Sequence, residues 1–377
     1  MSSILLVDQI GSVMDEYNEE LCTRLTDMGY EMVLATAANS EIKSSEFKKI
    51  ECFIGTYGQS CFLKKGINYI LSIIRLKELV KEVKPSVVHL QWALFSPIDY
   101  LFIKWLNKNA IPVLMTVHDV TPFNRKFYDR FFLPRIYGMT TELVVQSKIA
   151  WEELVNICEG KAISLIHHPT YNRSIKLIDN KIAKETLGFS NKTKMILFFG
   201  QIKKVKGVEY LLRAYTQVIK EYPDSILVIA GKSWGDSIDK YSDLANQIGI
   251  GNHVKWDTRF VPGELVPYYF SAADLVVLPY LHVYQSGVLQ LSFAYKRPVV
   301  ISNIPGLVEY VVDEVTGLVV PSRDDAKLAE AILNLLHDED LRLKLGSSGH
   351  EFAVQNFSWE MAAHRYNEIY SRLTSWD

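Results

Sequence analysis

Short, continuous apolar runs alternate with longer segments of helical period along the chain. In the first half the apolar runs lie at 4–8, 31–36, 87–92, 112–119, 142–147 and 162–168. Apolar residues in helical spacing separate some of them, over 15–28 and about 66–82. Runs without polar alternation are typical of parallel strands that are covered on both faces. The pattern therefore predicts a doubly wound α/β domain in the first half.

A second set of apolar runs follows, at 195–200, 225–231, 253–260, 275–280, 298–303 and 317–321. The stretch between the two sets, 171–192, is polar and is expected to be a linker. We therefore predict an α/β protein of two doubly wound, Rossmann-like domains, 1–170 and 193–357, that face a cleft. A last helix, 358–377, is expected to pack back on the first domain.

Composition narrows the class of ligand. The chain has 377 residues, of which 48% are hydrophobic and 22% charged, as in ordinary folded soluble proteins. Its 41 basic and 43 acidic side chains give a net charge of −2. No global field therefore draws it to nucleic acid, and we expect any binding of anions to be local.

The cysteines point to a reducing compartment. Four are present and show neither CxxC pairs nor metal-ligand spacing: Cys22, Cys52, Cys61 and Cys158. They are expected to be reduced thiols of a cytoplasmic protein. No basic segment precedes the apolar run ILLV, so no signal peptide is expected.

A lysine-rich turn stands out in the second half. The stretch LFFGQIKKVKGVEYLLRAY, 197–215, places Lys203, Lys204 and Lys206 between an apolar strand and an amphipathic helix. One interpretation is a solvated basic turn. The other is an anion site, because a helix N-terminus offers unpaired N–H groups and the positive end of the helix dipole.

A second candidate for phosphate binding follows the run LVVLPY. Ser286, Gly287 and Val288 are expected to open a helix there. A glycine lets the backbone approach a phosphate closely, and consecutive N–H groups form an anion-binding nest. The alternative is a plain loop before an apolar helix.

Four stretches in this order and spacing resemble the GT-B glycosyltransferases, in particular the retaining family 4 group. They are FFGQIKKVKG (198–207), SAADLVVLPY (271–280), QSGVLQLSFAYKRPVVIS (285–302) and IPGLVEYVVDEVTGLVVP (304–321). The resemblance implies that the second domain binds a nucleoside diphosphate sugar and the first an acceptor.

The resemblance also assigns residues on the donor side. Lys203 and Lys206 match the basic positions that hold the donor diphosphate, together with Ser286, Gly287 and Val288. Lysine binds phosphate there as a point charge. By the same resemblance, Gln285 and Glu309 would contact the donor sugar or ribose. For Glu309, a carboxylate that merely stabilises a helix start is the alternative.

One departure from the family pattern is plain. Most members carry two glutamates with seven residues between them near this helix, whereas no glutamate occurs from Leu275 to Val308. The chain resembles a subgroup that lacks this pair.

In the first domain, the resemblance points to His118 and Asp119, at the end of the run PVLMTVHD, as catalytic residues. A hydrogen-bonded structural histidine is the alternative for His118. Gly11, in the loop after the first strand, is implied on the acceptor side, with Tyr17 and Asn18 beside it. No protein-bound metal and no cofactor are expected, because no histidine lies in a metal-ligand pattern.

The segment 123–137 combines four basic residues and one acidic residue with interleaved aromatic residues. This combination suits an anionic membrane surface or a lipid-linked diphosphate acceptor. The alternative is an aromatic flap packed on its own domain. The aromatic residues are Phe123, Phe127, Tyr128, Phe131 and Phe132, and the basic residues are Arg125, Lys126, Arg130 and Arg135.

Taken together, the sequence predicts a retaining, metal-independent glycosyltransferase. It would move a sugar from a nucleoside diphosphate sugar to a hydroxyl of a glycan or lipid-linked saccharide, in polysaccharide or cell-surface glycan synthesis. Its expected place is the cytoplasm, peripheral on the inner face of the membrane, with no nucleic-acid partner. Two alternatives stay open: a non-catalytic nucleotide-sugar-binding partner of a transferase, and a sugar-nucleotide epimerase.

Overall fold

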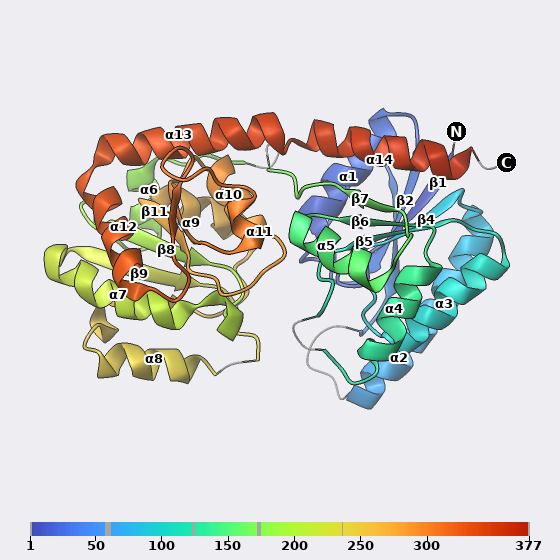
Figure 1. The fold of residues 1–377 in the computed structure, drawn as a ribbon, viewed down its shortest axis with the longest axis horizontal. Coiled ribbons are helices and arrows are strands. Elements are labelled where there is room, and N and C mark those ends of the chain that lie inside the picture. The colour runs from blue at the N-terminus through green and yellow to red at the C-terminus, as the bar shows by residue number, and fades with distance from the viewer. Residues whose placement is uncertain (1, 57–61, 123–124, 172–174, 236, 376–377) are drawn as a thin grey trace. The chain divides into compact units, whose positions relative to one another are not determined.

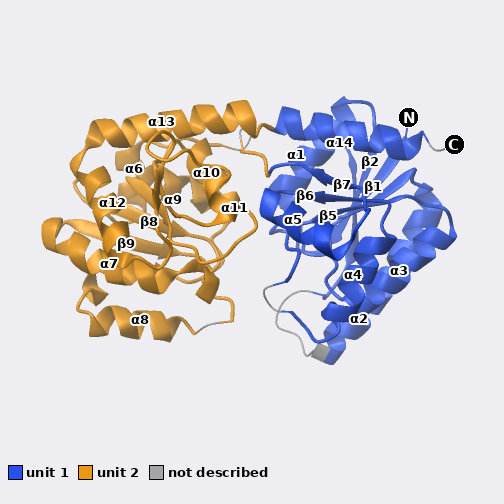
Figure 2. Cartoon of the chain, viewed as in Figure 1, with its two compact units in different colours: residues 1–167, 359–377 blue, residues 168–358 orange. Residues whose placement is uncertain are grey.

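The computed structural model describes residues 2–56, 62–122, 125–171, 175–235 and 237–375. They form two compact units (Figure 2). Unit 1 consists of residues 1–167 and 359–377, and unit 2 of residues 168–358. The chain therefore passes between the units twice, because its last segment belongs to unit 1.

Unit 1 is built on a parallel sheet with the strand order β3-β2-β1-β4-β5-β6-β7. The strands are β1 (Ser3–Val7), β2 (Glu31–Ala37), β3 (Lys48–Phe53), β4 (Val87–Leu90), β5 (Val113–Val117), β6 (Glu142–Val145) and β7 (Ile163–Leu165). β1, β4, β5 and β6 are buried along their whole length. Burial on both faces explains why their sequences are continuously apolar.

Helices cover the two faces of this sheet (Figure 1). Helices α1 and α14 pack together on one face, and α2, α3 and α4 lie on the other. The helices of unit 1 are α1 (Asp15–Asp27), α2 (Phe62–Val83), α3 (Ser96–Lys108), α4 (Asp129–Met139), α5 (Lys148–Ile157) and α14 (Trp359–Thr374).

Unit 2 contains a second parallel sheet, with the order β10-β9-β8-β11-β12-β13. Its strands are β8 (Lys194–Phe199), β9 (Ser225–Ala230), β10 (Val254–Asp257), β11 (Leu275–Leu278), β12 (Val299–Ser302) and β13 (Leu318–Val320). Strands β8 and β11 are neighbours at the centre of the sheet. The turns that follow these two strands therefore lie close together at one edge of the sheet.

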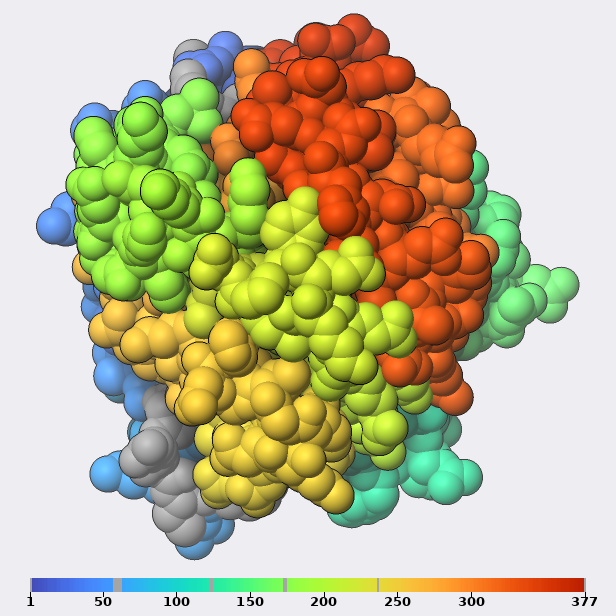
Figure 3. Space-filling model, turned by 90° about the vertical axis from the view of Figure 1, so that its left-hand side faces the viewer, coloured from blue at the N-terminus to red at the C-terminus, as the bar shows by residue number. Residues whose placement is uncertain are grey.

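The helices of unit 2 form its outer layers. Helix α7 packs beside α8 and α12, α10 beside α13, and α6 beside α9. Figure 3 views the unit from the end where α6, α7, α8 and the α12–α13 pair make up the surface. The helices are α6 (Asn180–Thr186), α7 (Val208–Glu221), α8 (Ile238–Gln247), α9 (Val266–Ala272), α10 (Gly287–Ala294), α11 (Pro305–Val308), α12 (Asp325–His337) and α13 (Glu339–Asn356). Three short 3-10 turns are η1 (Lys204–Lys206), η2 (Gly251–His253) and η3 (Gly263–Leu265).

The predicted fold class, two doubly wound α/β domains, is confirmed, and each expected strand has its counterpart. Strand β3, Lys48–Phe53, was not expected. It lies at the edge of the sheet and pairs only with β2, where the register shifts between Thr36 and Ala37. Its sequence KKIECF is half charged because an edge strand faces solvent. The stretch 171–192, expected as a linker, contains α6 and belongs to unit 2.

A buried histidine links α14 to the sheet of unit 1 through hydrogen bonds. The imidazole of His89, on β4, lies with Nδ1 2.6 Å from the hydroxyl of Tyr370 and Nε2 2.8 Å from that of Thr116. The Tyr366 hydroxyl lies 3.2 Å from that of Thr116. Burial, with a smaller effect of His118, lowers the pKa of His89 to about 3. The ring is therefore neutral in the folded protein.

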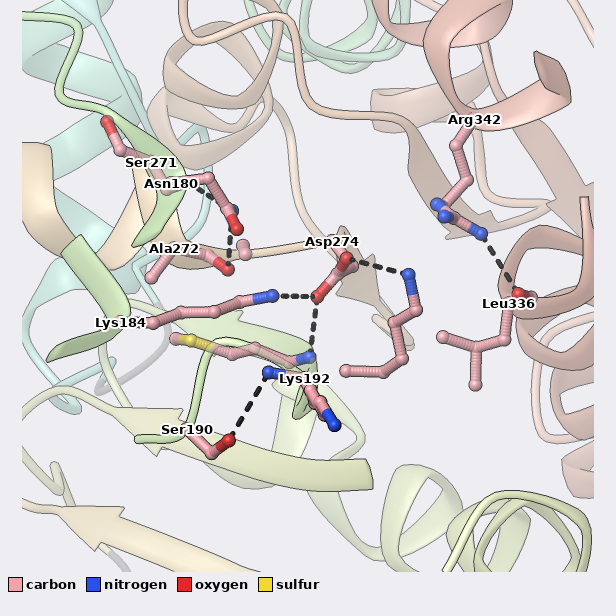
Figure 4. Close-up of polar contacts among 12 residues, drawn as sticks. Asn180, Lys184, Ser190, Lys192, Ser271, Ala272, Asp274, Leu336 and Arg342 are labelled. Carbon is pink, nitrogen blue, oxygen red and sulfur yellow. Dashed lines mark hydrogen bonds and ion pairs between the residues drawn. The ribbon is translucent and has the colours of Figure 1, made fainter. Parts of the chain in front are cut away.

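In unit 2, a buried ion pair links helix α6 to the sheet (Figure 4). The ammonium of Lys184, on α6, lies 2.9 Å from Asp274, which precedes β11. The same carboxylate accepts the backbone N–H of Met195 at 2.8 Å, and Lys194 lies 3.6 Å away. The side chains of Lys184 and Asp274 are only 3% and 11% exposed. Asp274 therefore joins α6 to the start of β8.

Replacing Asp274 is predicted to destabilise unit 2 strongly. Asp274→Ala leaves the Lys184 ammonium buried without its counter-ion, which costs about 3–5 kcal/mol. Calorimetric unfolding should show a loss of roughly 6–20 °C in Tm. Asp243→Ala, at an exposed carboxylate of α8, is the matched control and should melt like wild type. An Asp274→Ala protein that also melts like wild type would show that the ion pair contributes nothing.

His89 is predicted to make unit 1 sensitive to acid. Its pKa is lower in the folded state, about 3, than the ordinary 6.5, so the unfolded chain binds the extra proton first. The contribution of His89 to stability is therefore present above about pH 6.5 and lost as the pH falls, by roughly 2 kcal/mol at pH 5.

Urea unfolding of wild type and His89→Gln at pH 7.5 and pH 5 measures this difference. The loss between the two pH values should be smaller in His89→Gln by about that amount. His364→Gln, which alters an exposed histidine of α14, should behave like wild type. Equal pH dependence of all three proteins would contradict the assignment to His89.

Candidate functional site

The carboxylate of Asp8 organises the turn after β1 in unit 1. It accepts the backbone N–H groups of Ile10 and Gly11, both at 3.0 Å, and the side-chain amide of Asn18 at 3.0 Å. Asp8 is fully buried, and this burial raises its pKa to about 6 although the backbone hydrogen bonds oppose the rise. The turn after β1 is therefore held by one buried carboxylate.

His118 follows β5 and lies among aromatic and amide side chains. Its Nδ1 is 3.0 Å from Oε1 of Gln146, and its Nε2 is 2.8 Å from Oε1 of Gln91. The indole of Trp92 stacks on the imidazole with the ring centres 4.5 Å apart. Gln146 also donates its amide N–H to the Tyr17 hydroxyl at 3.2 Å. The position of His118, after β5, is thus determined by groups that follow the two neighbouring strands, β4 and β6.

Several buried polar atoms of this cluster have no hydrogen-bond partner among the described residues. They are Oε1 of Gln9, Oδ1 of Asn18, Nε2 of Gln91 and Nε1 of Trp92. A buried polar atom without a partner costs free energy, so such atoms gather where a polar ligand can satisfy them. Two of these atoms are acceptors and two are donors, which is the pattern that hydroxyl groups match.

The structure brings the residues predicted in the first domain together. Gly11 has a φ of 76°, and its N–H binds Asp8. Tyr17 and His118 lie edge to face, with ring centres 5.8 Å apart, and the Tyr17 hydroxyl lies 3.0 Å from that of Tyr366. Asp119 follows His118 and is half-buried.

In unit 2, the lysine turn after β8 is fixed by close contacts with the turn after β11. Gly207 has a φ of 65°, and a Cβ on it would lie 1.9 Å from the carbonyl oxygen of Pro279. Leu281 donates its N–H to the carbonyl of Val205 at 2.8 Å. The lysines lie in the 3-10 turn η1 or directly before it, and α7 begins only after Gly207.

The two predicted phosphate-binding segments meet around Tyr280. The ammonium of Lys206 lies 3.6 Å from the centre of the Tyr280 ring, a cation–π contact. The Tyr280 pKa is raised by burial, against which a hydrogen bond with Ser286 acts. Ser286 caps α10, since its Oγ accepts the N–H of Leu289 at 3.4 Å. The ammonium of Lys203 lies 5.8 Å from the centre of the Trp234 ring.

The first turn of α10 is closely surrounded. A Cβ on Gly200, at the end of β8, would lie 3.1 Å from Val288, and a Cβ on Gly287 would lie 3.7 Å from Nε2 of His168. Burial lowers the pKa of His168 to about 4, so that this ring is neutral. A side chain at Gly287 would therefore extend toward His168.

Gln285 and Glu309 lie on neighbouring turns. Oε1 of Gln285 is buried and has no hydrogen-bond partner in the described part of the chain. A Cβ on Gly306 would lie 2.1 Å from the carbonyl oxygen of Val283, so the turn that leads to Glu309 packs beside the approach to Gln285. Glu309 directly follows the C-terminal end of α11, so the alternative of a carboxylate at a helix start is wrong.

The basic and aromatic segment divides into an inward and an outward side. Asp129 is buried and accepts the Ser96 hydroxyl at 2.7 Å and the N–H of Lys126 at 2.7 Å. Phe132 packs against Tyr100, whereas Phe127 and Phe131 are 81% and 51% exposed. The basic side chains are all exposed, and three of them line a shallow depression with Phe127: Arg125, Lys126 and Arg130. Phe123, named with this segment, lies outside the described residues.

Two features that the described residues lack bear on the class of site. No group of three or more His, Cys, Asp or Glu side chains in them is arranged to hold a metal ion. Within the same ranges, no helix has the length and apolar character that a membrane span needs. Cys22, Cys52 and Cys158 are buried free thiols, and Cys61 lies outside the described ranges.

Sequence reasoning missed Asp8 and the two glutamines that contact His118. Asp8, Gln91 and Gln146 are each the first or second polar residue after a buried apolar strand, in ILLVD, VVHLQ and LVVQ. A polar residue directly after such a strand is a usable signal, because strand ends of a parallel sheet share an edge. The same signal identified His118.

Comparison with known families divides the chain in the same way. Residues 14–170 match Glycosyltransferase Family 4, and residues 179–352 match Glycosyl transferases group 1. The chain is 35% identical over 197 residues to the D-inositol 3-phosphate glycosyltransferase of Corynebacterium aurimucosum, which covers 51% of this chain and 46% of that protein. An uncharacterized glycosyltransferase of Methanocaldococcus jannaschii is 31% identical over 189 residues, 50% of this chain and 47% of that protein. The chain thus spans about half the length of the curated relatives it matches.

Solved structures share the fold along the whole chain. Sucrose-phosphate synthase of Thermosynechococcus elongatus superposes with a TM-score of 0.80 at 19% identity, covering 100% of both chains. Anabaena HepE in complex with UDP-glucose superposes with a TM-score of 0.78 at 15% identity, covering 99% of this chain and 100% of that chain. The predicted GT-B fold is thereby confirmed. Since the two family matches together take in residues 14–170 and 179–352, the chain belongs to the family 4, group 1 glycosyltransferases.

Proposed function

We propose that the protein transfers a sugar from a nucleoside diphosphate sugar to a hydroxyl acceptor with retention of configuration and without a metal ion. The observation that carries this proposal is the meeting of Lys206, Tyr280 and Ser286 in unit 2. It sets a fixed cation beside the capped start of α10. A helix start and lysines together neutralise a diphosphate.

In this proposal unit 2 binds the donor. Lys203, Lys206 and the α10 residues Ser286, Gly287 and Val288 hold the diphosphate, and its leaving charge is stabilised by groups that need no rearrangement. Gln285 and Glu309 contact the sugar or ribose, for which the unsatisfied Oε1 of Gln285 is support. A uridine diphosphate sugar is the first donor to test, because the Anabaena neighbour was solved with UDP-glucose.

Unit 1 then binds the acceptor. His118 and Asp119 orient the reacting groups, and Gly11, Tyr17 and Asn18 belong to the acceptor side. The unsatisfied donors and acceptors around His118 suit a polyhydroxyl ligand. The bond from the sugar to the diphosphate breaks while a bond to the acceptor oxygen forms on the same face. The acceptor proton passes to the departing phosphate oxygen.

We further propose a cytoplasmic enzyme that meets an anionic membrane through segment 123–137. The outward arginines and lysine and the exposed Phe127 and Phe131 support this contact. A lipid-linked saccharide in polysaccharide or cell-surface glycan synthesis is the acceptor that such a contact favours. The resemblance to a subgroup without the two glutamates stays a prediction.

Turnover of UDP-, GDP- and ADP-sugars with and without candidate acceptors tests the function. Transfer that depends on an acceptor supports the proposal. Release of an epimerised nucleotide sugar without any acceptor would identify an epimerase instead. Tight donor binding with no turnover under any condition would identify a non-catalytic binding partner.

Lys206 is predicted to strengthen donor binding. Lys206→Met keeps much of the packing on Tyr280 but removes the charge, and a charged hydrogen bond contributes about 1.5–3 kcal/mol. Isothermal titration with the donor should therefore show a roughly 10- to 150-fold higher Kd. Lys204→Met changes an exposed lysine of the same turn and should bind like wild type. Equal donor affinities of Lys206→Met and wild type would contradict the proposed role of Lys206 in binding the diphosphate.

Activity is predicted to persist in excess EDTA. The proposed site neutralises the diphosphate with lysine ammonium groups and helix N–H groups, which a chelator does not remove. Initial rates should agree within about twofold with and without the chelator, on the scale of 0.4 kcal/mol in the barrier. Loss of activity in EDTA that is restored by Mg²⁺ or Mn²⁺ would contradict the proposal.

A further inference from the structure

Helix α2 carries an apolar stripe on its outward face. Five large aliphatic side chains are 44–71% exposed there: Leu63, Ile67, Ile70, Leu71 and Ile74. Their spacing of four, three, one and three residues places them on one side of a helix. Single exposed apolar side chains are common on protein surfaces, but a continuous row of them marks a surface that something covers.

This stripe is distinct from the face that packs α2 onto unit 1. The inward residues Tyr69, Ile73, Leu76, Leu79 and Val80 are at most 6% exposed. At 100° per residue, the centre of this buried set lies on the side of the helix opposite to the stripe. The core of unit 1 therefore does not require the outward isoleucines and leucines.

Positive charges border the stripe on both sides. Lys64 and Arg75 are exposed along one border, and Lys77 lies along the other, 5.4 Å from the ring centre of Trp105. The acidic side chains of the helix, Glu78 and Glu82, lie at its C-terminal end. There they pair with lysines, at 2.7 Å for Lys81–Glu78 and 3.6 Å for Lys48–Glu82. The middle of the stripe is thus apolar with cationic borders.

Helix α3 contacts both α2 and α4, the helix of the basic and aromatic segment. Tyr69 of α2 donates its hydroxyl to Asp99 of α3 at 2.6 Å. Tyr100 of α3 packs against Phe132 of α4 with ring centres 5.5 Å apart. Leu101, also on α3, is 59% exposed. The three helices form one layer on the same face of the sheet (Figure 1).

We propose that α2 lies in the plane of an anionic lipid surface, with its outward stripe at the boundary between headgroups and acyl chains. A helix with an apolar face and basic borders has the pattern that binds such interfaces. The inference extends the proposed membrane contact of segment 123–137 to a second element, and it does not depend on the transfer reaction.

The charges favour a lipid surface over a second copy of the chain. In a two-fold symmetric dimer the same patch would face itself, so the lysines and arginine of one copy would approach those of the other. Like charges brought together in this way oppose association. Anionic headgroups supply the opposite charge along the whole border of the stripe.

Co-sedimentation of the full chain with vesicles tests this inference. The vesicles contain phosphatidylcholine with about one third phosphatidylglycerol, at low and at moderate salt. Ile67→Glu combined with Ile74→Glu should lower the partition coefficient at least about 10-fold, because acidic groups replace the centre of the stripe. The matched control is Leu177→Glu combined with Leu343→Glu, at positions of unit 2 that are 61% and 64% exposed, and it should bind like wild type.

Three results would overturn the proposal. They are a wild-type protein that ignores the vesicles at low salt, a stripe variant that binds them like wild type, and a dimer in sedimentation equilibrium that the stripe variant dissociates without any vesicle binding. A third protein, Arg130→Ser combined with Phe131→Ser, distinguishes the contribution of α4 to vesicle binding from that of α2, because it leaves the stripe intact. Donor titration of each protein shows independently whether unit 2 and the proposed function survive.

Discussion

A parallel sheet brings the carboxyl ends of all its strands to one edge, and the chemistry of this protein depends on that constraint. In unit 1, Asp8, Gln91 and His118 follow β1, β4 and β5, which are consecutive in the sheet. In unit 2, the lysine turn follows β8 and Tyr280 follows β11, its neighbour. The order of the strands in each sheet therefore determines which polar side chains lie close together.

The two edges differ in electrostatic character. The edge of unit 1 is lined by glutamine amides, by His118 and by a carboxylate whose pKa burial raises to about 6. The edge of unit 2 presents lysines and the N-terminal end of a helix. Amides match hydroxyl groups, whereas cations and N–H groups match phosphates. A transferase that joins a hydroxyl to a sugar carried on a diphosphate needs both kinds of edge.

Much of the fold was predictable, because two-sided burial leaves continuous apolar runs in the sequence. Strand β3 was not, since an edge strand such as KKIECF carries its polar residues outward. The glycine-flanked lysine turn was visible in sequence, but its contact with Tyr280 was not, because 74 residues separate Lys206 from Tyr280 in the chain. The apolar stripe of α2 was also invisible, because periodicity does not reveal which of two apolar faces the core covers.

Helix α14 gives the protein an unusual order of assembly. Trp359, Tyr366 and Tyr370 are fully buried in unit 1, yet they are synthesised after all of unit 2. Domains generally fold as units while the chain is made, from the N-terminus onward. Here the contiguous unit 2 has its complete sequence before unit 1 does, so the strands of unit 1 wait for α14 before their core can close. A ribosome that stops before α14 would release a finished second unit attached to an unfinished first one.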